Sequence, residues 1–259
     1  ISTGSWTIFS NEQTKFIGVN TVRFDAVKHR SLPVVADVSV TLEEMTVALA
    51  NWRADDSWSK LAQSEVAKYH SYIDGIAKKD SSKLATYAQV VGVADRLAQA
   101  GDYALTAAGG FPGELNNGWR AKSIDSFDCE YGFSCMGYEL SGAWGAKMAM
   151  PNREVISFVG DGSYMMMNSD IYSSVLYGHK LIVVVCDNGG YAVINRLQVN
   201  QGGVPFNNQI VDCDVQNLVY VDFAKHAESM GAIAETVGSI DDLEAAFSRA
   251  RKSDRTHVI

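Results

Sequence analysis

From residue 87 onward, short apolar runs alternate with segments of helical pattern, and this alternation limits the possible folds more than any other feature. The apolar runs cover residues 103–107, 155–160, 180–188, 233–237 and 256–259. Short runs that are apolar along their whole length are typical of strands buried on both faces. Strands that alternate with helices predict an α/β fold: a doubly wound, mostly parallel sheet with helices on both faces and right-handed crossovers.

The first 79 residues have a different texture. Two further strands are expected within residues 15–26 and 31–38, followed by helices up to residue 79. Thr41 and Glu44 have the spacing of a capping box, which predicts a helix start at Thr41. We therefore expect residues 1–40 to be the end of one domain and residues 41–259 to form a second. The chain has no initiator methionine and stops on an apolar run, so we expect it to be a truncated piece of a longer protein.

Composition narrows the function classes. Lys and Arg number 22 against 30 Asp and Glu, a formal net charge of −8, which argues against binding to nucleic acid or to a membrane surface. No apolar run approaches ~20 residues, so no membrane span is expected. The N-terminus does not resemble a secretory signal. The few cysteines form no C-x-x-C pair and predict buried free thiols in a reducing cytoplasm: Cys129, Cys135, Cys186 and Cys213.

Two neighbouring strand ends carry polar residues. Asp161 lies in Gly160-Asp161-Gly162-Ser163 at the end of one apolar run, and Asn188-Gly189-Gly190 ends the next run. Ligands of such folds bind beyond the carboxyl ends of the strands. A carboxylate, an amide oxygen and a backbone carbonyl suit Mg²⁺ when phosphate oxygens complete its coordination. The sequence therefore predicts a Mg²⁺-bridged diphosphate, although either motif alone is more often a plain turn.

These residues resemble a known family. Gly160-Asp161-Gly162 followed by Asn188 is similar to the signature of thiamine diphosphate-dependent enzymes. Residues 130–149 resemble the segment with the pyrimidine-facing wall of the cofactor site, and residues 84–110 the opening of the diphosphate-binding domain. Residues 15–38 resemble the end of the Rossmann-like middle domain in acetolactate-synthase-like members. The resemblance implies the thiamine diphosphate-binding fold for residues 41–259 and a middle-domain remnant before it.

The resemblance also implies roles for single residues. Asp161, Asn188 and the carbonyl of Gly190 would hold Mg²⁺. Met136 would support the bent cofactor, and the carbonyl of Ser134 would accept from its 4′-amino group. Cofactor binding is expected at twelve positions: Gly109, Gly110, Phe111, Ser134, Met136, Gly160, Asp161, Gly162, Ser163, Asn188, Gly190 and Tyr191.

Alternative roles for these residues stay open. Met136 could be a core side chain and Phe111 a lid. Glu114 could be an exposed loop acid or a substrate contact. Gly109, Gly110 and Phe111 stand where several relatives have Gly-x-His, so a histidine acting on protons is in doubt.

Within the family, residues 127–149 are most similar to the trihydroxycyclohexanedione hydrolases of inositol catabolism. These enzymes use thiamine diphosphate and Mg²⁺ to hydrolyse a C–C bond of a cyclic 1,2-diketone, giving 5-deoxy-glucuronate. Glu139-Leu140-Ser141 replaces the Leu-Pro pair of acetolactate synthases and favours the hydrolase. An acetolactate-synthase-like lyase or decarboxylase, and a non-catalytic module of the same fold, remain alternatives.

The resemblance implies partners as well. The activating glutamate is expected on an N-terminal pyrimidine-binding domain of the same or a partner subunit, so no catalytic residue is expected in this chain. The full-length protein is expected to be a cytoplasmic homo-oligomer with a small cyclic diketone as substrate.

Overall fold

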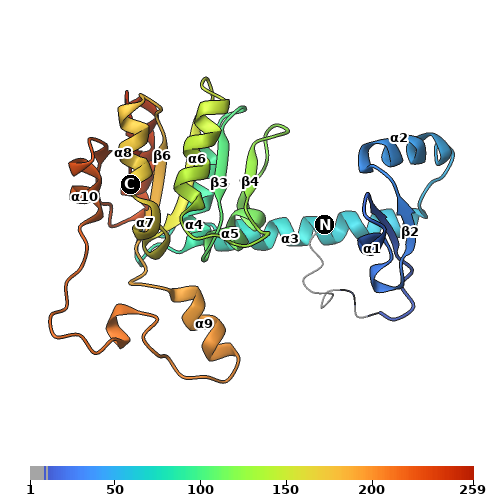
Figure 1. Cartoon of the computed structure of the whole chain (residues 1–259), viewed down its shortest axis with the longest axis horizontal. Coiled ribbons are helices and arrows are strands. Elements are labelled where there is room, and N and C mark those ends of the chain that lie inside the picture. The colour runs from blue at the N-terminus through green and yellow to red at the C-terminus, as the bar shows by residue number, and fades with distance from the viewer. Residues whose placement is uncertain (1–8, 10) are drawn as a thin grey trace. The chain divides into compact units, whose positions relative to one another are not determined.

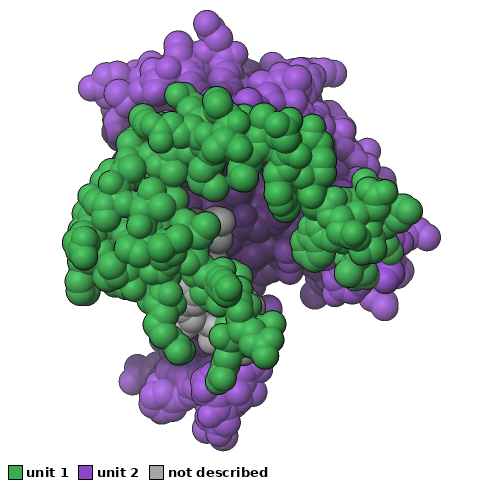
Figure 2. Space-filling view, turned by 90° about the vertical axis from the view of Figure 1, so that its right-hand side faces the viewer, with its two compact units in different colours: residues 1–65 green, residues 66–259 purple. Residues whose placement is uncertain are grey.

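The structure, a computed structural model, describes Phe9 and residues 11–259. Residues 1–8 and 10, which belong to the expected domain remnant, lie outside the described residues. The chain divides into two compact units, residues 1–65 and residues 66–259, shown in green and purple in Figure 2. The expected boundary at residue 40 falls inside the first unit, because the helix that follows it contacts a strand of that unit.

In the first unit, strands β1 (Ile17–Asn20) and β2 (Leu32–Val35) lie within the two segments where the sequence predicts strands, and they pair in parallel. The connection contains the short helix α1 (Arg23–Ala26) and a 3₁₀ turn, Lys28–Arg30. A Cβ on Gly18 would lie 2.3 Å from the carbonyl oxygen of Ala26, so only glycine fits where this connection passes the strand.

Helix α2 (Val38–Ala48) begins before the predicted start at Thr41. Its cap is Asp37, whose carboxylate accepts from the N–H groups of Ser39 (2.9 Å) and Val40 (3.2 Å). The capping box predicted at Thr41 is therefore wrong. Asp is as good a cap as Thr, and here the earlier side chain satisfies the free N–H groups of the helix.

The second unit contains a six-stranded sheet in the order β4-β3-β5-β6-β8-β7. Every neighbouring pair is parallel, which confirms the predicted α/β architecture. Non-consecutive neighbours mean that the chain crosses over between strands, through helices in most cases. The strands are β3 (Tyr103–Thr106), β4 (Phe127–Cys129), β5 (Val155–Gly160), β6 (Ile182–Cys186), β7 (Ile233–Ala234) and β8 (His257–Val258).

Side chains of the central strands alternate between two cores, and this alternation places helices on both faces of the sheet. In β5, Ile156 and Phe158 pack with α4, α5 and α11, whereas Val155 and Val159 pack with α6, α7, α8 and α10. All four side chains are fully buried. The helices are α3 (Asp56–Ile76), α4 (Tyr87–Leu97), α5 (Phe111–Gly118), α6 (Tyr138–Ala149), α7 (Asp161–Met167), α8 (Ser169–Leu176), α9 (Ala192–Asn200), α10 (Phe223–Ser229) and α11 (Ile240–Lys252).

Three helices and a strand were not expected from the sequence. Helix α1 lies at residues 23–26, within a run that was expected to be a strand, and the others are α5, α9 and β4. Helix α5 forms within the Gly-rich stretch after β3, with Pro112 in its first turn and Phe111 and Leu115 buried. Helix α9 buries no side chain, and Figure 1 shows it projecting away from the sheet. Edge strand β4 is only three residues long.

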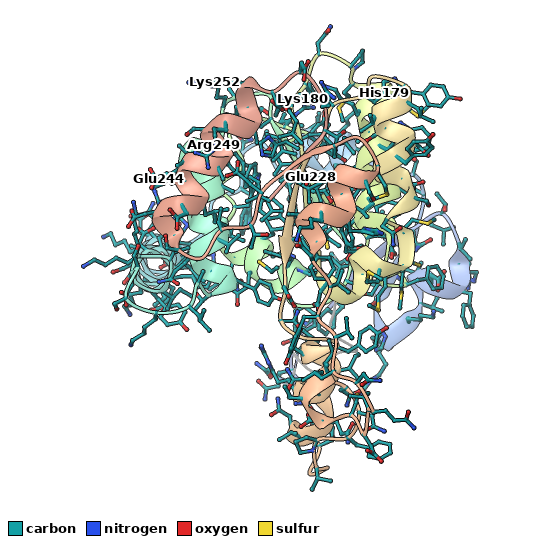
Figure 3. All side chains as sticks on the ribbon, turned by 90° about the vertical axis from the view of Figure 1, so that its left-hand side faces the viewer. His179, Lys180, Glu228, Glu244, Arg249 and Lys252 are labelled. Carbon is teal, nitrogen blue, oxygen red and sulfur yellow. The ribbon has the colours of Figure 1, made fainter. Side chains whose placement is uncertain are left out.

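The outer face of α11 is charged. Glu244, Arg249 and Lys252 point outward from it in Figure 3, while Leu243 and Phe247 are buried beneath. Acidic residues in the first turn and basic residues in the last turn match the helix dipole.

The sequence also predicts the absence of a membrane-spanning helix and the presence of buried free thiols. None of the helices in the described residues is long and apolar enough to cross a membrane. The four cysteines are free thiols, as expected, but none is fully buried: Cys135 is exposed, and Cys129, Cys186 and Cys213 are partly exposed.

Candidate functional site

The carboxyl ends of β5 and β6 meet at one edge of the sheet. The two strands pair in parallel with Gly160 opposite Cys186. Asp161 therefore begins α7 directly after β5, and Asn188 follows β6 by two residues at the same edge. This register brings together the two side chains that the sequence predicts as cation ligands.

One carboxylate oxygen of Asp161 has a partner and the other does not. The side chain is buried, and Oδ2 accepts the N–H of Gly190 at 2.6 Å. Oδ1 is buried and has no hydrogen-bond partner among the residues that the structure describes. Burial raises the pKa of the Asp161 carboxyl, and the N–H of Gly190 works against this rise. A buried carboxylate of this kind is stabilised by a cation placed against its free oxygen.

The amide of Asn188 is arranged in a similar way. Its Nδ2 donates to the hydroxyl of Tyr87 at 2.8 Å, and its Oδ1 is buried without a hydrogen bond. Buried polar atoms in proteins nearly always have a partner. Two unpartnered oxygens, one from a carboxylate and one from an amide, at one edge of the sheet fit a hard cation such as Mg²⁺. Among the described residues, no group of three His, Cys, Asp or Glu side chains forms a different metal site.

Gly190 lies in a turn that only glycine can make. Its φ is +134°, and a Cβ would lie 2.6 Å from the carbonyl oxygen of Asn208. The turn is tied down by hydrogen bonds from the N–H of Tyr191 to Asn208 (2.7 Å) and from the N–H of Ile210 to the carbonyl of Gly189 (2.8 Å). The Gly190 N–H is thereby held on Asp161. The carbonyl of Gly190 as a third cation ligand stays a prediction.

The start of α7 adjoins the wall predicted for the cofactor. A Cβ on Gly162 would lie 2.7 Å from the ring of Tyr191 and 3.5 Å from the Met136 side chain, so these three predicted residues are brought together. Ser163 is buried, and a Cβ on Gly160 would lie 3.6 Å from Nδ2 of Asn188. Met136 is half-buried.

The Gly-rich loop after β3 forms the neighbouring part of the edge. Gly109 has a φ of +77°, and a Cβ on Gly110 would lie 2.6 Å from the Tyr87 ring. Phe111 is 1 % exposed and packs against the rings of Tyr87 and Phe158, at centroid distances of 4.5 and 5.4 Å. The ring of Phe111 is therefore a core side chain rather than a lid, and its contact with a cofactor stays a prediction.

The loop before α6 is joined to β3. Ser134, with a φ of +53°, donates from its hydroxyl to the carbonyl of Ala107 at 3.1 Å. The carboxylate of Glu130 accepts the N–H groups of Phe133 and Cys135, each at 2.7 Å. These hydrogen bonds lower the pKa of Glu130, so the loop is held by an ionised side chain.

A cavity of about 770 Å³ opens beside Asn188. Tyr87, Glu114 and Arg196 line it together with residues 235–239. Glu114 lies in helix α5 and lines the same cavity as Asn188. A substrate contact by Glu114 stays a prediction.

Sequence reasoning missed two residues of this edge. Tyr87 orients Asn188, and Glu139 is a fully buried carboxylate at the start of α6. Tyr87 gives no signal, because it reads as an ordinary first-turn helix residue. Glu139 does give one, because it is an acid next to an apolar residue in the segment that departs from the acetolactate synthase pattern.

Comparison with known proteins agrees with this geometry. Residues 107–259 match the family described as thiamine pyrophosphate enzyme, C-terminal TPP binding domain. A protein from Halalkalibacterium halodurans named 3D-(3,5/4)-trihydroxycyclohexane-1,2-dione hydrolase is 33 % identical over 281 residues, and one of the same name from Bacillus subtilis is 31 % identical over 281 residues. Each alignment covers 100 % of this chain and 44 % of the relative, so the chain spans less than half the length of these proteins.

A solved structure shares the fold. The thiamine diphosphate-dependent 4-hydroxybenzoylformate decarboxylase of Rhodococcus jostii superposes with a TM-score of 0.71 at 20 % identity, over 96 % of this chain and 44 % of that one. The family match spans more than half of the chain and includes Asp161, Asn188 and Gly190. The chain therefore belongs to the thiamine pyrophosphate (thiamine diphosphate) enzymes, and residues 107–259 are its C-terminal TPP-binding domain.

Proposed function

We propose that this chain supplies the diphosphate- and Mg²⁺-binding half of the active site of an enzyme that hydrolyses a C–C bond in a cyclic 1,2-diketone. The observation that carries the cation site is the pair of buried, unpartnered oxygens on Asp161 and Asn188. The substrate class is supported by relatives named 3D-(3,5/4)-trihydroxycyclohexane-1,2-dione hydrolase. In this proposal the product is a 5-deoxy-glucuronate, and the setting is inositol catabolism.

In this proposal the residues at the carboxyl edge of the sheet hold Mg²⁺ and orient the cofactor. Asp161, Asn188 and the carbonyl of Gly190 would hold Mg²⁺, and Gly162 and Ser163 would contact the diphosphate of the cofactor. Thiamine diphosphate, when bound, supplies the nucleophilic carbon and the electron sink that C–C cleavage requires. Because Asp161 is buried, its charge acts on the cation with little screening by water.

Further residues of this chain would orient the thiamine rings. Met136, whose side chain lies close to Gly162, supports the bent shape. Ser134, Gly109 and Gly110 line the approach to the pyrimidine ring. In this proposal the activating glutamate belongs to a pyrimidine-binding domain of the same or a partner subunit. The full-length protein is proposed to be a homo-oligomer.

The test is a calorimetric titration of the intact protein with thiamine diphosphate, with and without Mg²⁺. We expect binding that requires Mg²⁺ and that weakens at least about 30-fold in Asp161→Ala, because the cation loses its only charged protein ligand in the proposed set. Asp254→Ala is the matched control, because this exposed acid forms an ion pair with its neighbour Arg255. Binding that ignores Mg²⁺, or that survives unchanged in Asp161→Ala, would overturn the proposal.

A further inference from the structure

Glu139 is a buried carboxylate to which the proposed function gives no role. It lies in the first turn of α6 and is 0 % exposed. Burial raises the pKa of its carboxyl, and hydrogen bonds from backbone N–H groups work against this rise. An acid that is costly to bury is kept where its two oxygens do something that an apolar side chain cannot do.

The two oxygens of Glu139 join two separate segments. Oε1 accepts the N–H of Ala108 at 3.0 Å, and Oε2 accepts the N–H of Gly137 at 2.8 Å. Ala108 directly precedes Gly109, and Gly137 directly follows Met136. One carboxylate therefore fixes the distance between the Gly-rich loop after β3 and the loop that enters α6.

One more contact attaches the same residue to β5. The backbone carbonyl of Glu139 accepts the hydroxyl of Ser157 at 2.6 Å, and Ser157 is a buried residue of β5. The loop before α6, the loop after β3 and the middle of β5 are thus all hydrogen-bonded to one residue.

The entry into α6 has little freedom to adjust. Gly137 has a φ of +98°, and a Cβ there would lie 2.9 Å from Cβ of Met167. The backbone at Gly137 therefore has little room to move, and its present conformation directs the N–H of Gly137 to Oε2 of Glu139. A change at Glu139 is transmitted through Gly137 to Met136, the residue directly before it.

We infer that Glu139 is a positioning residue: it sets the gap between the loop at Gly109 and the loop at Met136, and so aligns the thiamine half of the cofactor without touching the diphosphate half. This inference rests on the proposed function, because it assigns the two loops to the thiamine rings. Within the described residues, the side chains of Asp161 and Asn188 are not bonded to Glu139, since their hydrogen bonds run to Gly190 and Tyr87.

Glutamine at this position separates the two halves experimentally. A carboxylate offers an acceptor to each N–H, whereas an amide offers one oxygen and one NH₂ group. In Glu139→Gln, the N–H of Ala108 or of Gly137 therefore faces another donor, while the volume of the side chain is kept.

The experiment compares two ligands by calorimetry on the intact protein: thiamine diphosphate with Mg²⁺, and inorganic diphosphate with Mg²⁺. For Glu139→Gln we expect thiamine diphosphate to bind about tenfold more weakly and inorganic diphosphate to bind within about twofold of the wild type. Glu139→Asp keeps both acceptor oxygens, but its side chain is one methylene too short to reach both segments. We therefore expect the same selective loss of thiamine diphosphate affinity. This variant replaces Glu139→Gln in the test if the glutamine variant does not fold.

Two further variants distinguish positioning from a general loss of stability and from a loss of the cation site. Ser157→Ala removes the hydrogen bond to the backbone of Glu139 and leaves its carboxylate, so it should lower the melting temperature and leave the ratio of the two affinities unchanged. Asp161→Ala should weaken both ligands. The inference is overturned if Glu139→Gln binds thiamine diphosphate as tightly as the wild type, or weakens both ligands equally. A wild-type protein that binds neither ligand would overturn the proposed function itself, and the inference with it.

Discussion

At the scale of single residues, the hydroxyl of Tyr87 controls how Asn188 presents its amide. The hydroxyl oxygen accepts a hydrogen bond from Nδ2 of Asn188 at 2.8 Å, so the amide oxygen of Asn188 points away from Tyr87. Burial raises the pKa of Tyr87 to about 12, so the hydroxyl stays neutral at any pH where the protein would work. The ring also packs against Gly110 and Phe111. Tyr87 therefore links the predicted cation ligand to the Gly-rich loop.

Tyr87→Phe should keep this ring packing and free the amide to turn. We expect the affinity for Mn²⁺, used as a spectroscopic substitute for Mg²⁺, to fall about fivefold, because one hydrogen bond that orients a ligand is lost. Electron paramagnetic resonance of free Mn²⁺ measures this directly. Tyr69→Phe is the control, since that hydroxyl bonds Asn117 instead. An unchanged Mn²⁺ affinity in Tyr87→Phe would show that the hydrogen bond to Tyr87 is not needed to orient the Asn188 amide.

Residues of the site differ in how visible they are in the sequence. Asp161 and Asn188 could be found because each follows a buried strand, and the ends of neighbouring parallel strands meet. Tyr87 and Asn188 are far apart in the chain, and no local pattern predicts their hydrogen bond. Glu139 could be seen as an acid beside apolar residues, but its two backbone partners come from the fold.

At the scale of elements, the central strands and the long helices were predictable and the short or unburied elements were not. Strands β5 and β6 are apolar throughout because both of their faces are covered, and that pattern is visible in one dimension. Helix α5 lies in a segment whose glycines suggest a loop, and the burial of Phe111 and Leu115 against the core stabilises it. Helix α9 has no buried face and hence no hydrophobic period to detect.

The pairing of β8 with β7 predicts a response to pH. His257 in β8 is 3 % exposed, and its Nε2 lies 3.1 Å from Oε1 of Glu235. Burial lowers the pKa of His257, and Arg249 and Lys180 add to this, while Glu235 opposes it. A histidine with a lowered pKa binds its proton more tightly when the chain unfolds. Its stabilising contribution is therefore complete above about pH 6.5 and is lost as the pH falls below that value.

His257→Gln should consequently flatten the decline of the melting temperature between about pH 7 and pH 5, whatever the variant costs at neutral pH. Thermal unfolding followed by circular dichroism gives the two slopes. The exposed His70 provides the control variant His70→Gln, which should keep the wild-type slope. Equal slopes for the wild type and His257→Gln would place the acid sensitivity in another group.

At the scale of the whole molecule, the chain spans 44 % of the length of its hydrolase relatives. The predicted cofactor residues all lie in the second unit, residues 66–259. Substrate choice therefore has to be measured on the full-length protein. We expect ring opening of trihydroxycyclohexane-1,2-dione to an acid, followed by nuclear magnetic resonance, and no release of CO₂ from pyruvate. The reverse result would favour the acetolactate-synthase-like alternative.

The unpartnered oxygens of Asp161 and Asn188 have a consequence for selection experiments. A site that leaves two buried polar atoms without partners is a local weakness whenever its ligand is missing. If variant libraries are selected for heat resistance in a medium without cofactor, replacements at these positions, such as Asp161→Asn, should be enriched, and the selected variants should lose ligand binding. Adding Mg²⁺ and thiamine diphosphate during the selection should reverse the enrichment, because the bound ligand would then stabilise the wild-type residues.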